Sequence, residues 1–451
     1  MNERRMNAKT DARTSLPSSN GHAAGGNGAA AAPRRILTLF GTRPEIIKLA
    51  PVIHQLEADG RRFRTVNVTS AQHTDLLYPF IRLFNIRIDH DLQVMKPGQT
   101  PNQVCAAVLA ALEPILEEHR PDMLLVQGDT TTALAGALAG FHRRIPVGHV
   151  EAGLRSGNPL SPFPEEMNRR LVTQVAAYHF AATPRNRATL LREGVPAERV
   201  FLTGNPVVDS LHQILRRPNL SPAVERLVQS THGLKRVVLT THRRESFGET
   251  MSGNLQVLRD FVERHDDVVL VFPVHPNPSV RGVASAILSG HDRIRLLDPL
   301  DYFDFIGLLS RAWLIVSDSG GVQEEAPSLG KPLLVLRENT ERPEAMESGV
   351  ARLVGGEPER LRALLDEVYH DGRWANRVQG IENPFGRGDS GRRIVEVIAD
   401  VLRLEESGDR RQESGDRGQG ASAGAVDALH AAGGTQKNRS PAVPCPLTPD
   451  S

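Results

Sequence analysis

The chain has 451 residues and a mass of 49.3 kDa, which is enough for two or three domains of ordinary size. Its 54 Lys and Arg residues nearly balance its 53 Asp and Glu residues, leaving a formal charge of +1. This balance creates no global field that would attract nucleic acid or an anionic membrane, so neither is expected as a partner. Any anion site must therefore be local.

The cysteine content and the hydropathy pattern exclude further classes. Two cysteines are too few for a disulfide framework or a Cys-based zinc site. No stretch approaches the roughly 20 apolar residues that a membrane helix needs, and the basic first residues are followed by no apolar signal-peptide core. We therefore expect a cytoplasmic protein, and no metal site, since no cluster of ligand side chains has suitable spacing.

Both ends of the chain have the composition of disordered segments. Residues 1–33 are rich in Ser, Asn, Gly and Ala, whereas 407–451 repeat Ser-Gly-Asp-Arg and end in a Pro-rich stretch. Such segments bury too little apolar surface to offset the entropy lost on ordering. We expect disorder at both ends.

The central residues alternate between strand-like and helix-like patterns, which predicts an α/β fold with parallel sheets. Residues 102–119, for example, carry apolar side chains at helical spacing. Two series of five strands predict two doubly wound domains, 34–204 and 205–387, with the active site in the cleft between them at the carboxyl ends of the strands. The expected strands are 36–40, 66–69, 123–127, 147–150 and 179–182, then 237–240, 268–272, 294–297, 314–316 and 333–336.

A first phosphate-like loop follows the strand expected at 36–40. Thr42 and Glu45 have the spacing of a capping box, and Pro44 suits a first helical turn. Arg43 and Lys48 near this helix N-terminus oppose the helix dipole unless an anion binds there. This context predicts a phosphate site, although both cations pointing to solvent is the alternative.

A second phosphate-like loop follows the strand expected at 314–316. Ser319, Gly320 and Gly321 precede a helix, and two glycines there allow backbone amides to approach a diphosphate closely. Glu325, one turn into the helix, is a candidate ribose ligand. A plain glycine turn and a solvated glutamate would fit the same residues. Because the loop matches neither a dinucleotide fingerprint nor a P-loop, no nicotinamide cofactor is expected.

Three carboxylates are expected at one edge of the first sheet. Asp129 and Glu151 end strands, and Glu165 begins a helix. Such carboxylates serve acid and base chemistry when their environments separate their pKa values. A purely structural interpretation makes Asp129 and Glu165 helix caps and pairs Glu151 with Arg155. His242, at the end of the strand expected at 237–240, is a candidate phosphate ligand or proton shuttle, although a structural role would also suit it.

Taken together, the motifs resemble the non-hydrolysing UDP-N-acetylglucosamine 2-epimerase family over roughly residues 34–404. Each motif is modest alone, but the ordered set is highly specific. The set comprises Gly41 to Glu45, Gly128 to Thr131, His149 to Arg155, Pro164 to Arg169, His242 to Ser246, Asp318 to Pro327 and Thr340 to Glu344.

This resemblance implies a glycosyltransferase-B-like arrangement of two Rossmann-like domains, a homodimer, and a helix at 388–404 that crosses back to the first domain. It also implies a UDP-sugar substrate, reversible conversion of UDP-N-acetylglucosamine to UDP-N-acetylmannosamine without a cofactor, and a role in cell-envelope polysaccharide synthesis. The positions that match the family's catalytic group are Asp129, Glu151, Glu165 and His242. The further positions that match its substrate contacts are Arg43, Lys48, Ser319, Gly320, Gly321, Glu325 and Arg342.

The reaction expected from these residues is elimination of UDP to a bound glycal, followed by proton return to the opposite face and re-addition of UDP. Two positions depart from the family pattern: Thr241 stands where Gly is frequent, and Leu300 stands where Gln is frequent. The departure at Leu300 leaves room for an epimerase of a modified UDP-sugar. The sequence is also compatible with a hydrolysing 2-epimerase, a glycosyltransferase of the same fold or a non-catalytic sensor of nucleotide sugars.

Overall fold

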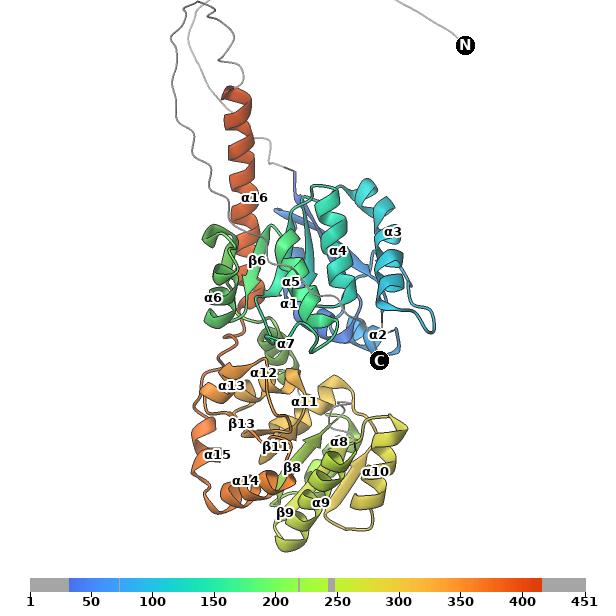
Figure 1. Ribbon diagram of the computed structural model, residues 1–451, viewed down its shortest axis with the longest axis vertical. Helices are drawn as coiled ribbons and strands as arrows, with labels where there is room; N and C mark the ends of the chain where they lie inside the picture. The colour runs from blue at the N-terminus through green and yellow to red at the C-terminus, as the bar shows by residue number, and fades with distance from the viewer. Residues whose placement is uncertain (1–31, 73, 218–219, 242–247, 416–451) are drawn as a thin grey trace, which may run out of the picture. The chain divides into compact units, whose positions relative to one another are not determined.

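The computed structural model describes residues 32–72, 74–217, 220–241 and 248–415 (Figure 1). The predicted α/β class is confirmed, because the described residues form two parallel sheets with helices between successive strands. Residues 1–31 and 416–451 lie outside the described part, so their expected disorder stays a prediction.

The first sheet has seven strands in the order β3-β2-β1-β4-β5-β6-β7, and every pairing is parallel. Its strands are β1 (Arg34–Phe40), β2 (Phe63–Thr69), β3 (His90–Asp91), β4 (Met123–Gln127), β5 (Val147–Ala152), β6 (Tyr178–Ala181) and β7 (Val200–Leu202). Its helices are α1 (Arg43–Ala58), α2 (Thr74–Leu83), α3 (Pro101–His119), α4 (Thr131–His142), α5 (Glu165–Val175), α6 (Pro184–Arg192) and the 3-10 helix η1 (Ala197–Arg199).

The second sheet has six strands in the order β10-β9-β8-β11-β12-β13, again all parallel. Its strands are β8 (Lys235–Thr240), β9 (Val268–Pro273), β10 (Ile294–Leu297), β11 (Leu314–Ser317), β12 (Leu333–Val335) and β13 (Ala351–Leu353). The helices of this part are α7 (Val207–Leu215), α8 (Pro222–Ser230), α9 (Glu249–Arg264), α10 (Pro278–Leu288), α11 (Tyr302–Ser310), α12 (Gly320–Leu329), α13 (Pro343–Glu347), α14 (Pro358–His370) and α15 (Arg373–Val378).

All ten predicted strands are present, and three further strands were not predicted. The three are β3, β7 and β13, which have two or three residues each and lie at sheet edges. The equally short β12 was found because it lies in a run of four apolar residues, whereas the residues of these edge strands offer shorter or interrupted apolar runs. The predicted domain boundary near 204 falls between β7 and α7.

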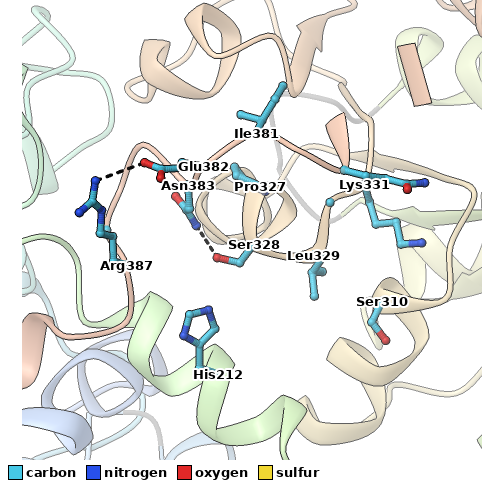
Figure 2. Close-up of a pocket in the computed structure, with 13 residues that line it drawn as sticks. His212, Ser310, Pro327, Ser328, Leu329, Lys331, Ile381, Glu382, Asn383 and Arg387 are labelled. Carbon is cyan, nitrogen blue, oxygen red and sulfur yellow. Dashed lines mark hydrogen bonds and ion pairs between the residues drawn. The ribbon is translucent and has the colours of Figure 1, made fainter. Parts of the chain in front are cut away.

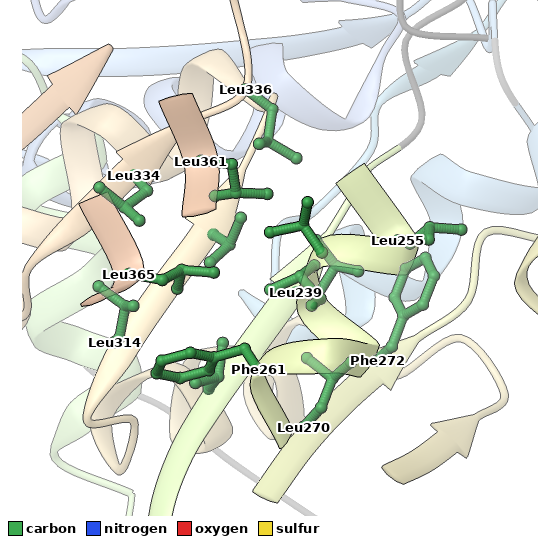
Figure 3. Packing of buried hydrophobic residues seen from close by; sticks show 14 of the residues in the cluster. Leu239, Leu255, Phe261, Leu270, Phe272, Leu314, Leu334, Leu336, Leu361 and Leu365 are labelled. Atoms are coloured by element: carbon green, nitrogen blue, oxygen red, sulfur yellow. The ribbon is translucent and has the colours of Figure 1, made fainter. Parts of the chain in front are cut away.

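The cores form because the central strands are apolar on both faces. In the second sheet, Leu239 of β8, Leu270 of β9 and Leu314 of β11 pack with Phe261 of α9 and Leu365 of α14 (Figure 3). All five side chains are buried. Continuous apolar strands of this kind are typical of parallel sheets covered by helices on both faces.

Each sheet has a point at which the strand order reverses, and ligands of doubly wound sheets bind beside such points. In the first sheet the reversal lies between β1 and β4, and in the second between β8 and β11. The predicted loops at Arg43, Asp129 and Ser319 follow β1, β4 and β11 directly. The fold therefore brings these loops to the two switch points.

The last described helix, α16, spans Ser390–Gly415. A helix ending at 404 and disorder from 407 were expected, so the structure differs here. Residues 404–415 mix the good helix formers Glu, Arg and Gln with Gly, Ser and Asp, so neither propensity nor an apolar stripe predicts the continuation of this helix. Over the described ranges, no helix is both long and apolar enough to cross a bilayer.

Candidate functional site

A cavity of about 520 Å³ lies at the carboxyl ends of β1, β4 and β5. Asp129, Glu151 and Glu165 all line it, so the structure brings the three predicted carboxylates together. Three predicted cations, Arg43, Lys48 and Arg342, contribute to the same lining. The remaining lining residues include Thr42, Glu45, Gln72, Gln99, Gln127, Thr130, Thr131, Leu154 and Asn168.

The N-terminus of α1 has the predicted capping box. The Glu45 carboxylate accepts hydrogen bonds from the backbone N–H groups of Gly41 and Thr42 at 2.9 and 2.8 Å, and from the Thr130 hydroxyl at 2.7 Å. Burial raises the pKa of Glu45 to about 7, although these hydrogen bonds act to lower it. Arg43 is exposed at the cavity rim, with its guanidinium 5.8 Å from the Phe80 ring centre.

Lys48 does not point to solvent. It is buried, and its ammonium group contacts two carboxylates: Glu151, and Glu324 at 3.4 Å. Burial lowers the pKa of Lys48, but these two carboxylates outweigh it and raise the pKa above the ordinary value. The ammonium is therefore a fixed positive charge beside the cavity.

Glu151 is held at both carboxylate oxygens. Lys48 and Asn205 donate to Oε1, the latter at 3.0 Å, and Gln127 donates to Oε2. Burial acts to raise the pKa of Glu151, but Lys48 and Arg342 lower it to about 2. Glu151 is therefore ionised throughout the physiological range.

The backbone of Glu151 is in the left-handed region, with φ at +64°. This conformation is uncommon for a residue with a side chain, and such outliers cluster at functional sites. It coincides with the register shift between β5 and β6 at Val150 and Ala152. The irregularity turns the Glu151 side chain toward the cavity that it lines.

Asp129 is bound by Arg169 of α5. The Arg169 Nε and Nη2 atoms lie 2.8 and 2.6 Å from Asp129 Oδ2, and Asn168 donates to the Asp129 carbonyl at 2.8 Å. Arg169 Nη1 also donates to the fully buried Glu166 at 3.2 Å. Burial nevertheless raises the pKa of Asp129, because Arg169 offsets it only in part.

Glu165 is the first residue of α5 and is half-buried at the cavity wall. Its pKa is raised, first by burial and then, less strongly, by repulsion from Asp129. The cavity lining therefore holds three carboxyl groups with raised pKa values, Glu45, Asp129 and Glu165, and one, Glu151, with a lowered pKa. This separation is typical of sites that perform acid and base chemistry.

The second phosphate-like loop starts α12, as predicted. A Cβ atom on Gly320 would lie 2.7 Å from Arg342 Nη1, so only glycine lets that guanidinium approach this closely. Arg342 Nε lies 2.6 Å from Glu324 Oε1, and Nη1 lies 3.0 Å from Glu341 Oε2. Because Glu324 contacts Lys48 as well, it links Arg342 to the Glu151 network.

Glu325 is buried, so it is not a solvated helix residue. The Tyr302 hydroxyl donates to its Oε1 atom at 2.6 Å. Burial raises the pKa of Glu325 to about 7 against this hydrogen bond. The Glu325 carboxyl group, with a pKa of about 7, thus lies roughly one helical turn after Gly320 in α12.

The purely structural roles that the sequence allowed for Asp129 and Glu151 do not hold. Thr130, not Asp129, caps α4, and Arg155 pairs with Glu193 at 2.7 Å rather than with Glu151. His242 lies outside the described residues, so its predicted role stays a prediction. Thr241 just before it is described, and its hydroxyl donates to Asp318 at 2.7 Å.

Sequence reasoning assigned no role to several groups that contact the predicted ones. Gln127, Asn205, Arg169, Glu324 and Tyr302 all belong to this set. Of these, Glu324 had a readable signal, since a second carboxylate stands next to Glu325. In the described part of the chain, no group of three or more His, Cys, Asp or Glu residues could hold a metal ion.

The chain is similar to known proteins over most of its length. Residues 54–399 match the family described as UDP-N-acetylglucosamine 2-epimerase. The chain is 45% identical to "UDP-N-acetylglucosamine 2-epimerase" of Yersinia pestis over 369 residues, 81% of this chain and 98% of that protein.

Two solved structures are similar as well. A UDP-GlcNAc 2-epimerase from Neisseria meningitidis bound to UDP-GlcNAc has 39% identity and a TM-score of 0.76, covering 81% of this chain and 100% of that one. The Methanocaldococcus jannaschii UDP-GlcNAc 2-epimerase in complex with UDP-GlcNAc and UDP has 33% identity and a TM-score of 0.68, covering 81% and 99%. The chain belongs to the UDP-N-acetylglucosamine 2-epimerase family.

Proposed function

We propose that this protein is an isomerase that reversibly converts UDP-N-acetylglucosamine to UDP-N-acetylmannosamine by inverting carbon 2. The observation that carries the proposal is the cavity in which Asp129, Glu151 and Glu165 meet at the sheet's switch point. Family membership supports it, and so do similar proteins whose structures hold UDP-GlcNAc.

The diphosphate is proposed to bind where the two predicted loops begin their helices. Arg43 at the rim and Arg342 in the lining supply positive charge, and the amides of Gly320 and Gly321 supply donors at the start of α12. The predicted Ser319 amide instead donates to the Ser317 hydroxyl at 3.0 Å. Helix N-termini and guanidinium groups both favour phosphate. His242 and Glu325 keep their proposed contacts with the diphosphate and the ribose.

Carbon 2 bears an acetamido group and has no adjacent carbonyl, so its hydrogen is barely acidic. We propose that a base takes this proton while the bond from carbon 1 to the phosphate oxygen breaks. The electron pair leaves with UDP, and a double bond forms between carbons 1 and 2. A proton then returns to the opposite face, and UDP adds back to carbon 1.

The environments of the carboxyl groups suggest how they divide this work. Burial raises the pKa values of Asp129 and Glu165 above their ordinary values, so these two groups hold a proton more readily than Glu151 and suit proton exchange. Glu151 stays ionised, with a pKa of about 2, and its fixed negative charge suits the positive charge that develops at carbon 1 as UDP departs. Lys48 holds Glu151 in place and remains charged.

The reaction is tested by incubating the purified protein separately with each of the two UDP-sugars and separating the products by chromatography. The same equilibrium mixture from both starting points, with no lasting free UDP, is expected. Accumulation of UDP with free N-acetylmannosamine would assign a hydrolysing enzyme instead. Absence of turnover with both sugars would contradict the proposed substrate.

We also propose a homodimer and a cytoplasmic location. Leu160, Phe163, Met167 and Leu171 are 72, 67, 36 and 45% exposed, and Met167 and Leu171 lie one turn apart on α5. Exposed apolar side chains gathered in this way favour a protein interface. Sedimentation of the L171D variant should show loss of a dimer that the parent protein forms; a monomeric parent would contradict the proposal.

The low cysteine content supports the proposed cytoplasmic location.

A further inference from the structure

Asn205 connects the Glu151 carboxylate to the place where the chain leaves the first sheet. It lies between β7 and α7 and is 1% exposed. Its side-chain amide donates to Glu151 Oε1 at 3.0 Å, and its own Oδ1 accepts from the Val207 N–H at 3.2 Å. The amide is therefore fixed on both sides.

The same residue is bound to the segment that brings the chain back. The Asn205 N–H donates to the Phe385 carbonyl at 2.6 Å. Next to it, Gly204 has φ at +83°, and a Cβ atom there would lie 3.4 Å from Gly386 Cα and 2.6 Å from Ser390 Oγ. Only glycine allows the outgoing and returning segments to approach this closely.

Asp209 of α7 fixes the returning chain a few residues later. Its carboxylate oxygens accept the backbone N–H groups of Ser390 and Gly391 at 3.1 and 3.0 Å, at the start of α16. The outgoing and returning segments are thus joined at two points, and only the first, Asn205, also contacts Glu151.

The returning segment also borders a cavity. A cavity of about 630 Å³ lies between the segment that carries Asn383 and Arg387 and the helix that carries His212 (Figure 2). The Asn383 side chain spans from this segment to Ser328 at 2.7 Å. The returning segment is therefore held to α12 through Asn383 and to the outgoing segment through the Asn205 N–H.

We propose that Asn205 is a positioning residue that orients Glu151 and ties that orientation to both chain crossings. The inference rests on the proposed function, in which Glu151 acts at the substrate. It adds a physical link between the arrangement of the two sheets and the geometry of the reacting groups. A misplacement of about 1 Å in such a group costs on the order of 100-fold in rate.

Among the described residues, Asn205 and Gln127 donate to Glu151 as neutral amides, and they differ in kind from the charged groups around it. Lys48 of α1 and Arg342 before α13 are cations, Asp129 after β4 is an anion, and Glu324 of α12 shares Lys48. Asn205 is a neutral donor, so removing its amide changes the orientation of Glu151 while all of these charges stay in place.

The first test is the Asn205→Ala variant. We expect kcat to fall roughly 10- to 100-fold, whereas UDP affinity by calorimetry changes less than about threefold because no diphosphate ligand is lost. The exposed Asn376 of α15 offers a matched control, and Asn376→Ala should leave both values unchanged. An Asn205→Ala variant with parental kcat would overturn the inference.

The second test uses Asn205→Asp, which keeps the acceptor for Val207. A protonated carboxyl group there donates to Glu151 as the amide does, whereas an ionised one repels it. Two adjacent carboxylates share a proton with a raised apparent pKa. We therefore expect the kcat of this variant, relative to the parent protein, to decrease as pH rises from 5 to 8, with thermal unfolding recorded at each pH.

A ratio that does not change with pH while the variant stays folded would also overturn the inference, and this test remains if the alanine variant does not fold. The Glu151→Gln variant distinguishes the positioning role of Asn205 from the proposed role of Glu151 itself. If Glu151→Gln is inactive and both Asn205 variants behave like the parent, only the positioning role fails. If Glu151→Gln keeps parental turnover, the proposed role of Glu151 fails.

Discussion

At the scale of single residues, the site is organised by the charge that each environment favours. Lys48 and Arg342 keep Glu151 ionised, whereas burial raises the pKa values of Asp129 and Glu165. Carboxyl groups of one cavity thus differ in how readily they hold a proton. This division is testable one residue at a time.

Glu165→Gln should lower turnover by at least about 100-fold, the usual scale for a general acid or base. The substitution keeps the size of the side chain, and within the described residues Glu165 forms no ion pair with Arg43 or Arg342, so UDP affinity should stay near the parental value. Steady-state kinetics and calorimetry measure the two effects. Near-parental turnover would remove Glu165 from the mechanism.

Arg342→Ala should weaken UDP binding roughly tenfold or more, since a charge-assisted hydrogen bond contributes about 2 kcal/mol. It also leaves the buried Glu324 without its 2.6 Å partner, which costs about 3 kcal/mol of unfolding free energy. Arg373→Ala is the matched control, because Arg373 pairs with Asp371 at the surface. Unchanged UDP affinity in Arg342→Ala would count against the assignment.

The sequence was sufficient to identify three carboxylates and three cations that line the cavity, but not their partners. Asp129, Glu151 and Glu165 were readable because each stands where a strand ends or a helix begins. The hydrogen bond from Asn205 to Glu151 joins residues 54 positions apart, and no local pattern encodes it. The same holds for Tyr302 and Glu325, which meet only after α11 and α12 have packed.

At the scale of elements, the start of α12 shows how one glycine shapes a site. Gly320 admits the Arg342 guanidinium, whereas a Cβ atom on the neighbouring Gly321 would meet nothing closer than Ser319 Oγ at 3.9 Å. The two glycines are adjacent in sequence and differ in what approaches them. The pair therefore provides its own control.

Gly320→Ala should displace Arg342 from Glu324 and lower the melting temperature. Gly321→Ala adds a methyl group in open space within a helix, where alanine is favoured over glycine, so its melting temperature should equal or exceed the parental one. Differential scanning calorimetry compares the two variants. Equal destabilisation of both would show that the approach of Arg342 does not determine the requirement at Gly320.

Prediction of the elements succeeded where the patterns were long. Helix α3 was predicted from apolar residues at helical spacing, and α1 from its capping residues. The edge strands β3, β7 and β13 were missed because their apolar runs are short or interrupted, and their pairing depends on the neighbouring strand. The end of α16 was missed because residues 404–415 carry no apolar stripe and include Gly and Ser among their helix-forming residues.

At the scale of the whole molecule, buried carboxyl groups make stability depend on pH. Burial raises the pKa of Glu325 from 4.5 to about 7. Between these two values the unfolded chain is ionised at this residue while the folded chain keeps its proton. The contribution of Glu325 to stability therefore declines as pH rises from about 4.5 to about 7.

Glu325→Gln removes this ionisation and keeps an acceptor for the Tyr302 hydroxyl. The variant and the parent protein should have similar unfolding free energies at pH 4.5, and the variant should become progressively more stable, relative to the parent, up to pH 7. Urea unfolding at a series of pH values measures the difference. A difference that does not change with pH would contradict the raised pKa.

The measurement that tests the central claim most directly is proton NMR of the protein with UDP-N-acetylglucosamine in heavy water. The account predicts that the carbon-2 epimer appears, that deuterium replaces hydrogen at carbon 2 in both sugars, and that UDP stays attached at equilibrium. Epimer formation that retains the original hydrogen at carbon 2 would contradict proton exchange by the carboxyl groups of this cavity.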